Sequence, residues 1–246
     1  MSTIDPKLLD RDPERVARMF GEISPRYDLL NRVLSCGLDG SWRKKTVRLA
    51  EPQGVDRILD LATGTGDLAF EFAHAGGFQG EVLGLDFSEE MIARARAKAA
   101  ARGVAHRVHF RHGDALAIQE PDLSFGIVSV GFGVRNFADP ERALLEALRV
   151  LAPGGRLVLV DFFRKPESGF VRWYLDHVLP RVGRWISRSP TAYRYLRESK
   201  QSFLSPDELG DLLLRLGAAR VDVVELTFGI AHVVRATKPG PSAASV

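Results

Sequence analysis

The amino-acid sequence predicts an α/β fold built on a doubly wound, mostly parallel sheet, and two observations carry this prediction. Apolar runs of strand length alternate with segments of helical periodicity. The helical segments also begin with residues that favour helix starts. Because strands joined by helices in this rhythm pair in parallel, helices are expected on both faces of the sheet. The expected strands are RILDLA (57–62), EVLGLDF (81–87), RVHFRH (107–112), FGIVSVGF (125–132) and GRLVLVDFF (155–163).

Three helix starts can be predicted from residue chemistry. Ser88 precedes EEMIARARAKAA and can accept a hydrogen bond from a free amide of the first turn. Asp139 can do the same, with Pro140 at the first helical position. Ser205 and Glu208 form a capping box ahead of LGDLLLRLG.

Further along, the segment 220–238 predicts two strands that turn at Gly229. The chain accordingly divides into five segments, which do not repeat one another. They are a helical cover (1–50), a nucleotide-binding βαβ core (51–163), a basic helical insertion (164–204), a helix and hairpin completing the sheet (205–238) and a disordered tail (239–246).

The composition is that of one globular domain. The 246 residues are 45% hydrophobic and 26% charged, and no apolar run approaches the ~20 residues that a membrane-spanning helix needs. The first residues lack the basic and apolar regions of a secretion signal, and the single cysteine can form no internal disulfide. We therefore expect a cytoplasmic protein.

Positive charge is concentrated in one segment. The net charge of +3 is too small to indicate nucleic-acid binding by itself. Residues 164–200, however, contain nine Lys and Arg against three Asp and Glu, a net charge of +6. We expect this segment to contact the inner face of the cell membrane transiently, with Trp173, Tyr174 and Trp185 near the headgroups. The alternative is an ordinary solvated helical surface.

The segment DLATGTGDLAF (60–70) indicates nucleotide binding. Gly64, Thr65 and Gly66 follow an expected strand and open an expected helix, so the backbone can turn tightly and approach a ligand. Asp86 ends the next strand, where its carboxylate can accept hydrogen bonds from ribose hydroxyls. NAD would be bound in the same way, so these residues alone leave a dehydrogenase open.

Three features favour S-adenosylmethionine over NAD. Asp114 and Ala115 follow the third strand, where they can hold an adenine edge. Asp60 and Asp67 flank the glycine turn with negative charge, which suits a cationic sulfonium better than a pyrophosphate. No Tyr-x-x-x-Lys pair follows the fourth strand, as a short-chain dehydrogenase would require. We expect S-adenosylmethionine as the cofactor, S-adenosylhomocysteine as its product, and no metal, because no clustered His or Cys spacing is present.

Four motifs of the chain are distinctive: MFGEISPRYDLLNRVLSCGLDGSWR (19–43), VGFGVRNFADP (130–140), AYRYLRES (192–199) and LTFGI (226–230). With them, residues 14 to 239 resemble the UbiE/MenG methyltransferases of ubiquinone and menaquinone synthesis. The resemblance implies a class I S-adenosylmethionine-dependent methyltransferase fold of seven strands, and methyl transfer to the ring carbon of a demethylated prenylquinol.

The resemblance also implies a set of site residues. Thr65, Asp86 and Asp114 with Ala115 fall on the donor site, and Gly131 stands where relatives often have serine. Six side chains are candidates to line the acceptor site, with simple packing as the alternative: Tyr27, Asp28, Asn31, Trp42, Tyr193 and Tyr195.

Arg135 and Asn136 follow the fourth strand, at the edge where α/β sheets bind ligands. We expect Arg135 to stabilise a phenolate oxygen and Asn136 to orient it. A guanidinium with a pKa above ~12 is a poor base. The alternative is an arginine that bridges loops through salt links.

The substrate itself is less sharply defined. GLDGSW (37–42) resembles the form of the motif found in menaquinone enzymes, which favours demethylmenaquinol over a ubiquinone-pathway benzoquinol. A nucleic-acid methyltransferase is disfavoured because no N-P-P-Y or Pro-Cys motif follows the fourth strand. A non-catalytic adenosine-binding protein stays open for any such fold, and so does a homodimer.

Overall fold

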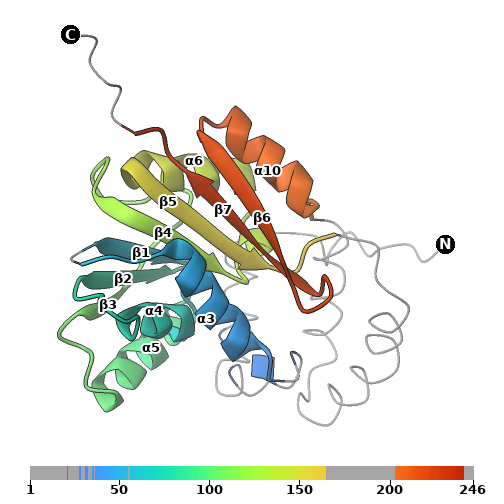
Figure 1. The fold of residues 1–246 in the computed structure, drawn as a ribbon. Coiled ribbons are helices and arrows are strands. Elements are labelled where there is room, and N and C mark those ends of the chain that lie inside the picture. The colour runs from blue at the N-terminus through green and yellow to red at the C-terminus, as the bar shows by residue number, and fades with distance from the viewer. Residues whose placement is uncertain are drawn as a thin grey trace.

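The structure is a computed structural model that describes residues 21, 28, 31–32, 35, 37–54, 56–164 and 203–240. Its centre is one seven-stranded sheet with the order β3-β2-β1-β4-β5-β7-β6 (Figure 1). The prediction of a seven-stranded α/β sheet is confirmed. The strands are β1 (Arg57–Leu61), β2 (Glu81–Asp86), β3 (Val108–His112), β4 (Phe125–Gly131), β5 (Leu151–Asp161), β6 (Arg220–Leu226) and β7 (Ala231–Thr237).

The directions of the strands determine where in the sheet a binding site can form. Strands β1 to β5 pair in parallel, whereas β7 runs antiparallel to both β5 and β6, as the predicted hairpin requires. After β3 the chain crosses back and adds β4 on the other side of β1. The connections at the carboxyl ends of β1 and β4 therefore leave the sheet in opposite directions, and a crevice forms between them.

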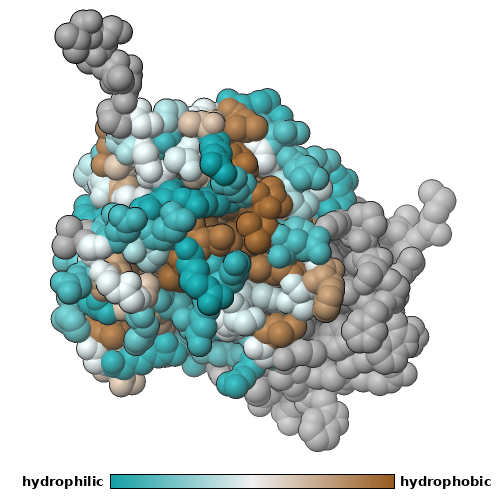
Figure 2. All heavy atoms as spheres, viewed as in Figure 1, coloured by the Kyte–Doolittle hydropathy of each residue, from teal (hydrophilic) through white to brown (hydrophobic). Residues whose placement is uncertain are grey.

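Helices cover both faces of this sheet, and their apolar sides form two clusters of buried residues. One cluster receives α3 (Asp39–Ala50), α4 (Asp67–Ala73) and α5 (Glu89–Ala101). The other receives α6 (Pro140–Val150), which lies behind the sheet in Figure 1, and α10 (Pro206–Arg215), which lies beside β6. Figure 2 shows the face on the side of α3, whose described part is largely hydrophilic with an apolar area beside α3.

The predicted helix caps are confirmed. The Ser88 hydroxyl accepts a hydrogen bond from the amide of Met91, and the Asp139 carboxylate accepts one from the amide of Arg142. Both halves of the Ser205–Glu208 capping box are present.

Strand β5 begins earlier than expected, at Leu151 instead of residue 155. Its pairing with β4 shifts register between Phe125 and Ile127, so the Pro-Gly-Gly stretch bulges out of the ladder without ending the strand. None of the helices in the described part of the chain has the length and apolar character to cross a membrane.

Candidate active site

A pocket opens at the carboxyl edge of the sheet, in the crevice between the connections that follow β1 and β4. Segments that follow β2 and β3 complete its wall. Most of the donor-site residues expected from the sequence meet here. The pocket is lined by Leu61, Ala62, Gly64, Leu85, Asp86, Phe87, Ser88, Met91, Gly113, Asp114, Ala115, Leu116, Gly131, Phe132, Gly133, Asn136, Phe137 and Ala138.

The glycine turn needs its glycines for two reasons. Gly64 and Gly66 have φ angles of 56° and 86°, in the left-handed region that other residues enter at a cost. A Cβ at Gly66 would also lie 2.5 Å from Cζ of Phe110. The turn can therefore pack on β3 and still direct the amide of Gly64 at the pocket-lining Asp86, 2.8 Å away.

The carboxylate of Asp86 is oriented so that it can accept hydrogen bonds from two neighbouring hydroxyl groups. Its Oδ2 accepts from the Gly64 amide, and its Oδ1 accepts from the Ser88 amide at 2.9 Å. Because a carboxylate oxygen has two lone pairs, each oxygen keeps one for a further donor. Burial raises the pKa of Asp86, although the two amides oppose this rise. The amides thus orient a half-buried carboxylate that can accept further hydrogen bonds from a ligand.

Backbone strain is found on the same wall. Ala62 and Phe132 both line the pocket, and their φ angles of 49° and 60° are unusual for residues with a Cβ. The Phe132 amide donates to the carbonyl of Val160 at 2.7 Å, which holds its backbone in place. Strain of this kind is retained where neighbouring structure enforces it, and it is concentrated at functional sites.

Asp114 is a second carboxylate that lines the pocket. It is half-buried, and its Oδ1 accepts from the Leu116 amide at 2.9 Å, so the carboxylate is oriented and keeps lone pairs for another donor. Phe87, Met91 and Phe137 contribute apolar surface to the same pocket. Gly131 lines the pocket as well, and a Cβ there would lie 3.0 Å from Leu68.

The two aspartates that flank the glycine turn differ from the expectation. Asp67 does not present a free negative charge, because Lys98 lies 2.5 Å from its carboxylate and Arg43 and Arg102 lie 3.7 and 3.8 Å away. Asp60 is fully buried and accepts from the Thr63 and Ser129 hydroxyls, both at 2.6 Å. Burial raises its pKa to about 6. The charge argument for the donor therefore holds for neither residue in its simple form.

Arg135 and Asn136 occupy the short helix η3 (Val134–Asn136) and face different surroundings. Asn136 lines the pocket. Arg135 is 5% exposed, forms an ion pair with the buried Asp161 and donates to the Phe132 carbonyl at 2.9 Å. This is the geometry of the bridging arginine, which here supports the pocket wall. Its direct contact with an acceptor stays a prediction.

The three expected acceptor-site residues that the structure describes do not line the pocket. Trp42 is buried, and its indole donates to the Thr227 hydroxyl at 2.8 Å. Asp28 accepts from Thr65 and Lys98. The half-buried Asn31 accepts the amide of Ser35 through its carbonyl. Tyr27, Tyr193 and Tyr195 lie outside the described residues, as does the basic segment 165–200.

Lys98 is the residue that sequence reasoning missed. It lies on α5, 31 residues beyond Asp67 along the chain, yet it contacts Asp28, Thr65 and Asp67 together. A lysine near the end of a helix carries no distinctive signal, since it equally suits the negative end of the helix dipole.

Comparison with solved structures identifies the fold as that of the class I methyltransferases. An S-adenosylmethionine-dependent methyltransferase from Aquifex aeolicus superposes with a TM-score of 0.59 and 22% identity, over 79% of this chain and 88% of that one. The [4+2]-cyclase SpnF superposes with a TM-score of 0.67 and 18% identity, over 92% and 96%. At such identities the likeness concerns the fold.

The chain belongs to the ubiE/COQ5 methyltransferase family, whose model matches residues 9–238, and it is a methyltransferase. It is 49% identical to a demethylmenaquinone methyltransferase of Thermus thermophilus, over 90% of this chain and all of that protein. It is 46% identical to the protein of the same name in Deinococcus radiodurans, over 89% and 90%. A ubiquinone/menaquinone biosynthesis C-methyltransferase of Geobacter sulfurreducens is 40% identical, over 92% and 89%. The family expected from the motifs is thereby confirmed.

Proposed function

We propose that the protein transfers a methyl group from S-adenosylmethionine to a ring carbon of a prenylated quinol, converting demethylmenaquinol to menaquinol. The observation that carries the donor assignment is Asp86, whose two oxygens are held by backbone amides with lone pairs left toward the pocket. The acceptor assignment is supported by the names of the two relatives above 45% identity and by the motif GLDGSW.

The residues of the pocket fit this donor. Asp86 can accept both ribose hydroxyls, Asp114 can accept the adenine amino group, and Phe87 and Met91 can sandwich the ring plane. The bound donor supplies an electrophilic methyl on a sulfonium. The chain's task is to hold that methyl in line with the ring carbon and to exclude water, which is where positioning lowers the barrier.

Asn136 is the residue we assign to the acceptor oxygen, because it lines the pocket and its side-chain amide can donate to a phenolate. The reaction forms a bond from the ring carbon to the methyl, breaks the bond from the methyl to sulfur and releases the ring proton. Negative charge builds on the quinol oxygen before the transfer, so a donor there stabilises the reacting form. Arg135 acts one contact further away, through Phe132 and Asp161.

Membrane contact through residues 164–200 is part of this proposal, together with a cytoplasmic location at the inner face of the membrane. It is supported by the net charge of +6 and by the need to collect a prenylated substrate from the bilayer. Attraction to anionic lipid is about 1 kcal/mol for each Lys or Arg near the surface, so several residues suffice for reversible docking.

The test is isotopic methyl transfer from labelled S-adenosylmethionine into quinol extracts and into RNA. We expect label in menaquinol. Label in a benzoquinol precursor alone would assign the protein to the ubiquinone branch, and label in RNA alone would refute the acceptor class.

The same assay checks the donor site through Asp86→Ala, with the exposed neighbour Glu89→Ala as the matched control. Each charge-assisted hydrogen bond lost is about 1.5–3 kcal/mol, so S-adenosylhomocysteine should bind Asp86→Ala at least 10-fold more weakly. Unchanged affinity in calorimetry would remove Asp86 from the site.

A further inference from the structure

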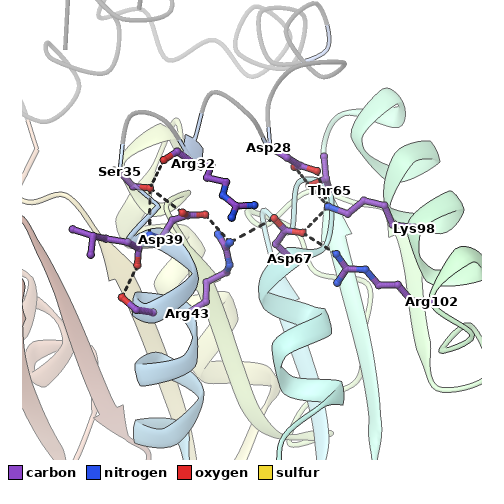
Figure 3. A network of polar contacts seen from close by, with 11 residues as sticks. Asp28, Arg32, Ser35, Asp39, Arg43, Thr65, Asp67, Lys98 and Arg102 are labelled. Carbon is purple, nitrogen blue, oxygen red and sulfur yellow. Dashed lines mark hydrogen bonds and ion pairs between the residues drawn. The ribbon is translucent and has the colours of Figure 1, made fainter. Parts of the chain in front are cut away.

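A group of charged side chains joins the N-terminal part of the chain to the glycine turn (Figure 3). Its centre is Lys98, which reaches across from α5. The ammonium lies 2.5 Å from Oδ1 of Asp67, 2.8 Å from Oδ2 of Asp28 and 3.0 Å from the hydroxyl oxygen of Thr65. One cation therefore joins two segments of the chain, one at Asp28 and the other at the glycine turn with Thr65 and Asp67.

Thr65 connects this group to the pocket. Its hydroxyl donates to Oδ1 of Asp28 at 2.6 Å, so Asp28 is bound through both oxygens. Thr65 also stands between Gly64 and Gly66 in the glycine turn. The amide of Gly64, the preceding residue, contacts the pocket-lining Asp86. A short path of direct contacts thus leads from Asp28 to the carboxylate that faces the donor.

The group is balanced in charge and continues toward α3. Arg43 lies 3.7 Å from the Asp67 carboxylate and 2.6 Å from that of Asp39, and Asp39 accepts the Ser35 hydroxyl at 2.8 Å. With Arg102, 3.8 Å from Asp67, three cations meet three carboxylates. Residues 28, 35 and 39 are therefore tied to α4 and α5 by polar contacts.

Asp28 is suited to be the movable end of this group. Its side chain is 47% exposed, against 27% for Asp67. Less of the Asp28 side chain therefore changes its surroundings from protein to water when it leaves the cluster. Burial raises its pKa, but hydrogen bonds from Lys98 and Thr65 and the charges of Lys98 and Arg43 outweigh burial and lower it. Asp28 is thus ionised and paired near neutral pH.

We propose that Lys98 is a positioning residue that fastens Asp28 onto the glycine turn, so that donor binding and the contact of Asp28 with Thr65 favour each other. A ligand that orders the turn fixes Thr65 in the place where Asp28 can bind it. By linkage, docking of Asp28 must then raise donor affinity by the same factor. The inference rests on donor binding at the pocket and is independent of which quinol is methylated.

The alternative is that Lys98 only stabilises the fold. The two roles differ in one respect, because a purely structural cation affects the protein equally with and without donor. A coupling residue changes the response to donor, and that response can be measured apart from turnover.

The experiment compares wild type with Lys98→Met, Lys98→Arg and the control Lys44→Met, which removes the same charge from an exposed position on α3. S-adenosylhomocysteine affinity is measured by calorimetry, and amide hydrogen exchange of peptides spanning residues 28–39 is followed with and without this ligand. Lys98→Met should bind about 5- to 20-fold more weakly, the range of a moderate coupling between sites. The ligand should slow exchange of these peptides in wild type and Lys44→Met but not in Lys98→Met, with partial recovery in Lys98→Arg.

A second variant tests whether Lys98 acts through Asp28. If Lys98 acts through Asp28, Asp28→Asn should weaken binding in wild type and add little in the Lys98→Met background. Equal ligand protection of residues 28–39 in wild type and Lys98→Met, or affinities within two-fold, would overturn the proposal. Failure of wild type to bind the ligand at all would instead refute the donor assignment on which the proposal depends.

Discussion

Because Asp60 is buried, we predict that the free energy of unfolding of the protein depends on pH in an unusual way. The carboxylate of Asp60 is 1% exposed and lies beneath the glycine turn, where burial raises its pKa from 3.8 to about 6 despite hydrogen bonds from Thr63 and Ser129. A rise of this size corresponds to about 3 kcal/mol between the two protonation states. The protonated form is favoured in the folded protein, so Asp60 adds stability below about pH 4, and this stability is lost as the pH rises through about 6.

The change to test is Asp60→Asn, which removes the titration and can still hydrogen-bond to both hydroxyls. Free energies of unfolding in urea would be measured from pH 4 to pH 8 for wild type, Asp60→Asn and the exposed control Asp211→Asn. The stability of wild type relative to Asp60→Asn should fall by about 3 kcal/mol across this range, because only wild type must bury the ionised group. A pH-independent difference, or the same slope for Asp211→Asn, would refute the assignment.

Two other substitutions test the glycine turn and the support of the pocket wall by thermal and urea unfolding. Gly66→Ala should cost about 2 kcal/mol or more, since it adds a Cβ at a positive φ and against Phe110, whereas Gly76→Ala, with open space around it, should cost less than about 1 kcal/mol. Arg135→Ala should cost about 3–5 kcal/mol by leaving Asp161 buried without its cation, and the double change Arg135→Met with Asp161→Leu should recover much of that loss. A stable but inactive Arg135→Ala would return Arg135 to direct contact with the acceptor.

The sheet could be predicted because its signals are local. Each strand is an apolar run between polar connections, and three helix caps lie directly before the helices that they start. The glycine turn and Asp86 are likewise determined by their position after β1 and β2, since parallel strands bring their carboxyl ends together. The positions of most pocket-lining residues at the ends of β1, β2 and β3 follow from this rule.

The partners of charged residues could not be predicted in this way. Arg135 meets Asp161, 26 residues further along, and Lys98 meets Asp28, 70 residues away. Such pairs depend on how helices and loops pack, which the periodicity of one segment does not encode. The sequence therefore identified Arg135 as important by its place after β4, but it could not indicate that the guanidinium turns toward the interior of the protein.

The placement of Arg135 also bears on how one fold performs different chemistry. SpnF is named as a cyclase and shares this fold with a TM-score of 0.67, so the fold does not by itself specify methyl transfer. One wall of the pocket in this chain includes Phe132, held at a positive φ, and Asn136, the residue that we propose for the acceptor oxygen. Arg135 connects this wall to the end of β5 by its bonds to the Phe132 carbonyl and Asp161. A buried ion pair adds little net stability compared with apolar packing, and its directional bonds are better suited to fixing a strained loop in one geometry. If Asn136 contacts the acceptor as we propose, changes at Arg135 should weaken binding of the acceptor more than binding of S-adenosylhomocysteine, because Arg135 precedes Asn136 in η3 whereas Asp86 and Asp114 belong to other segments.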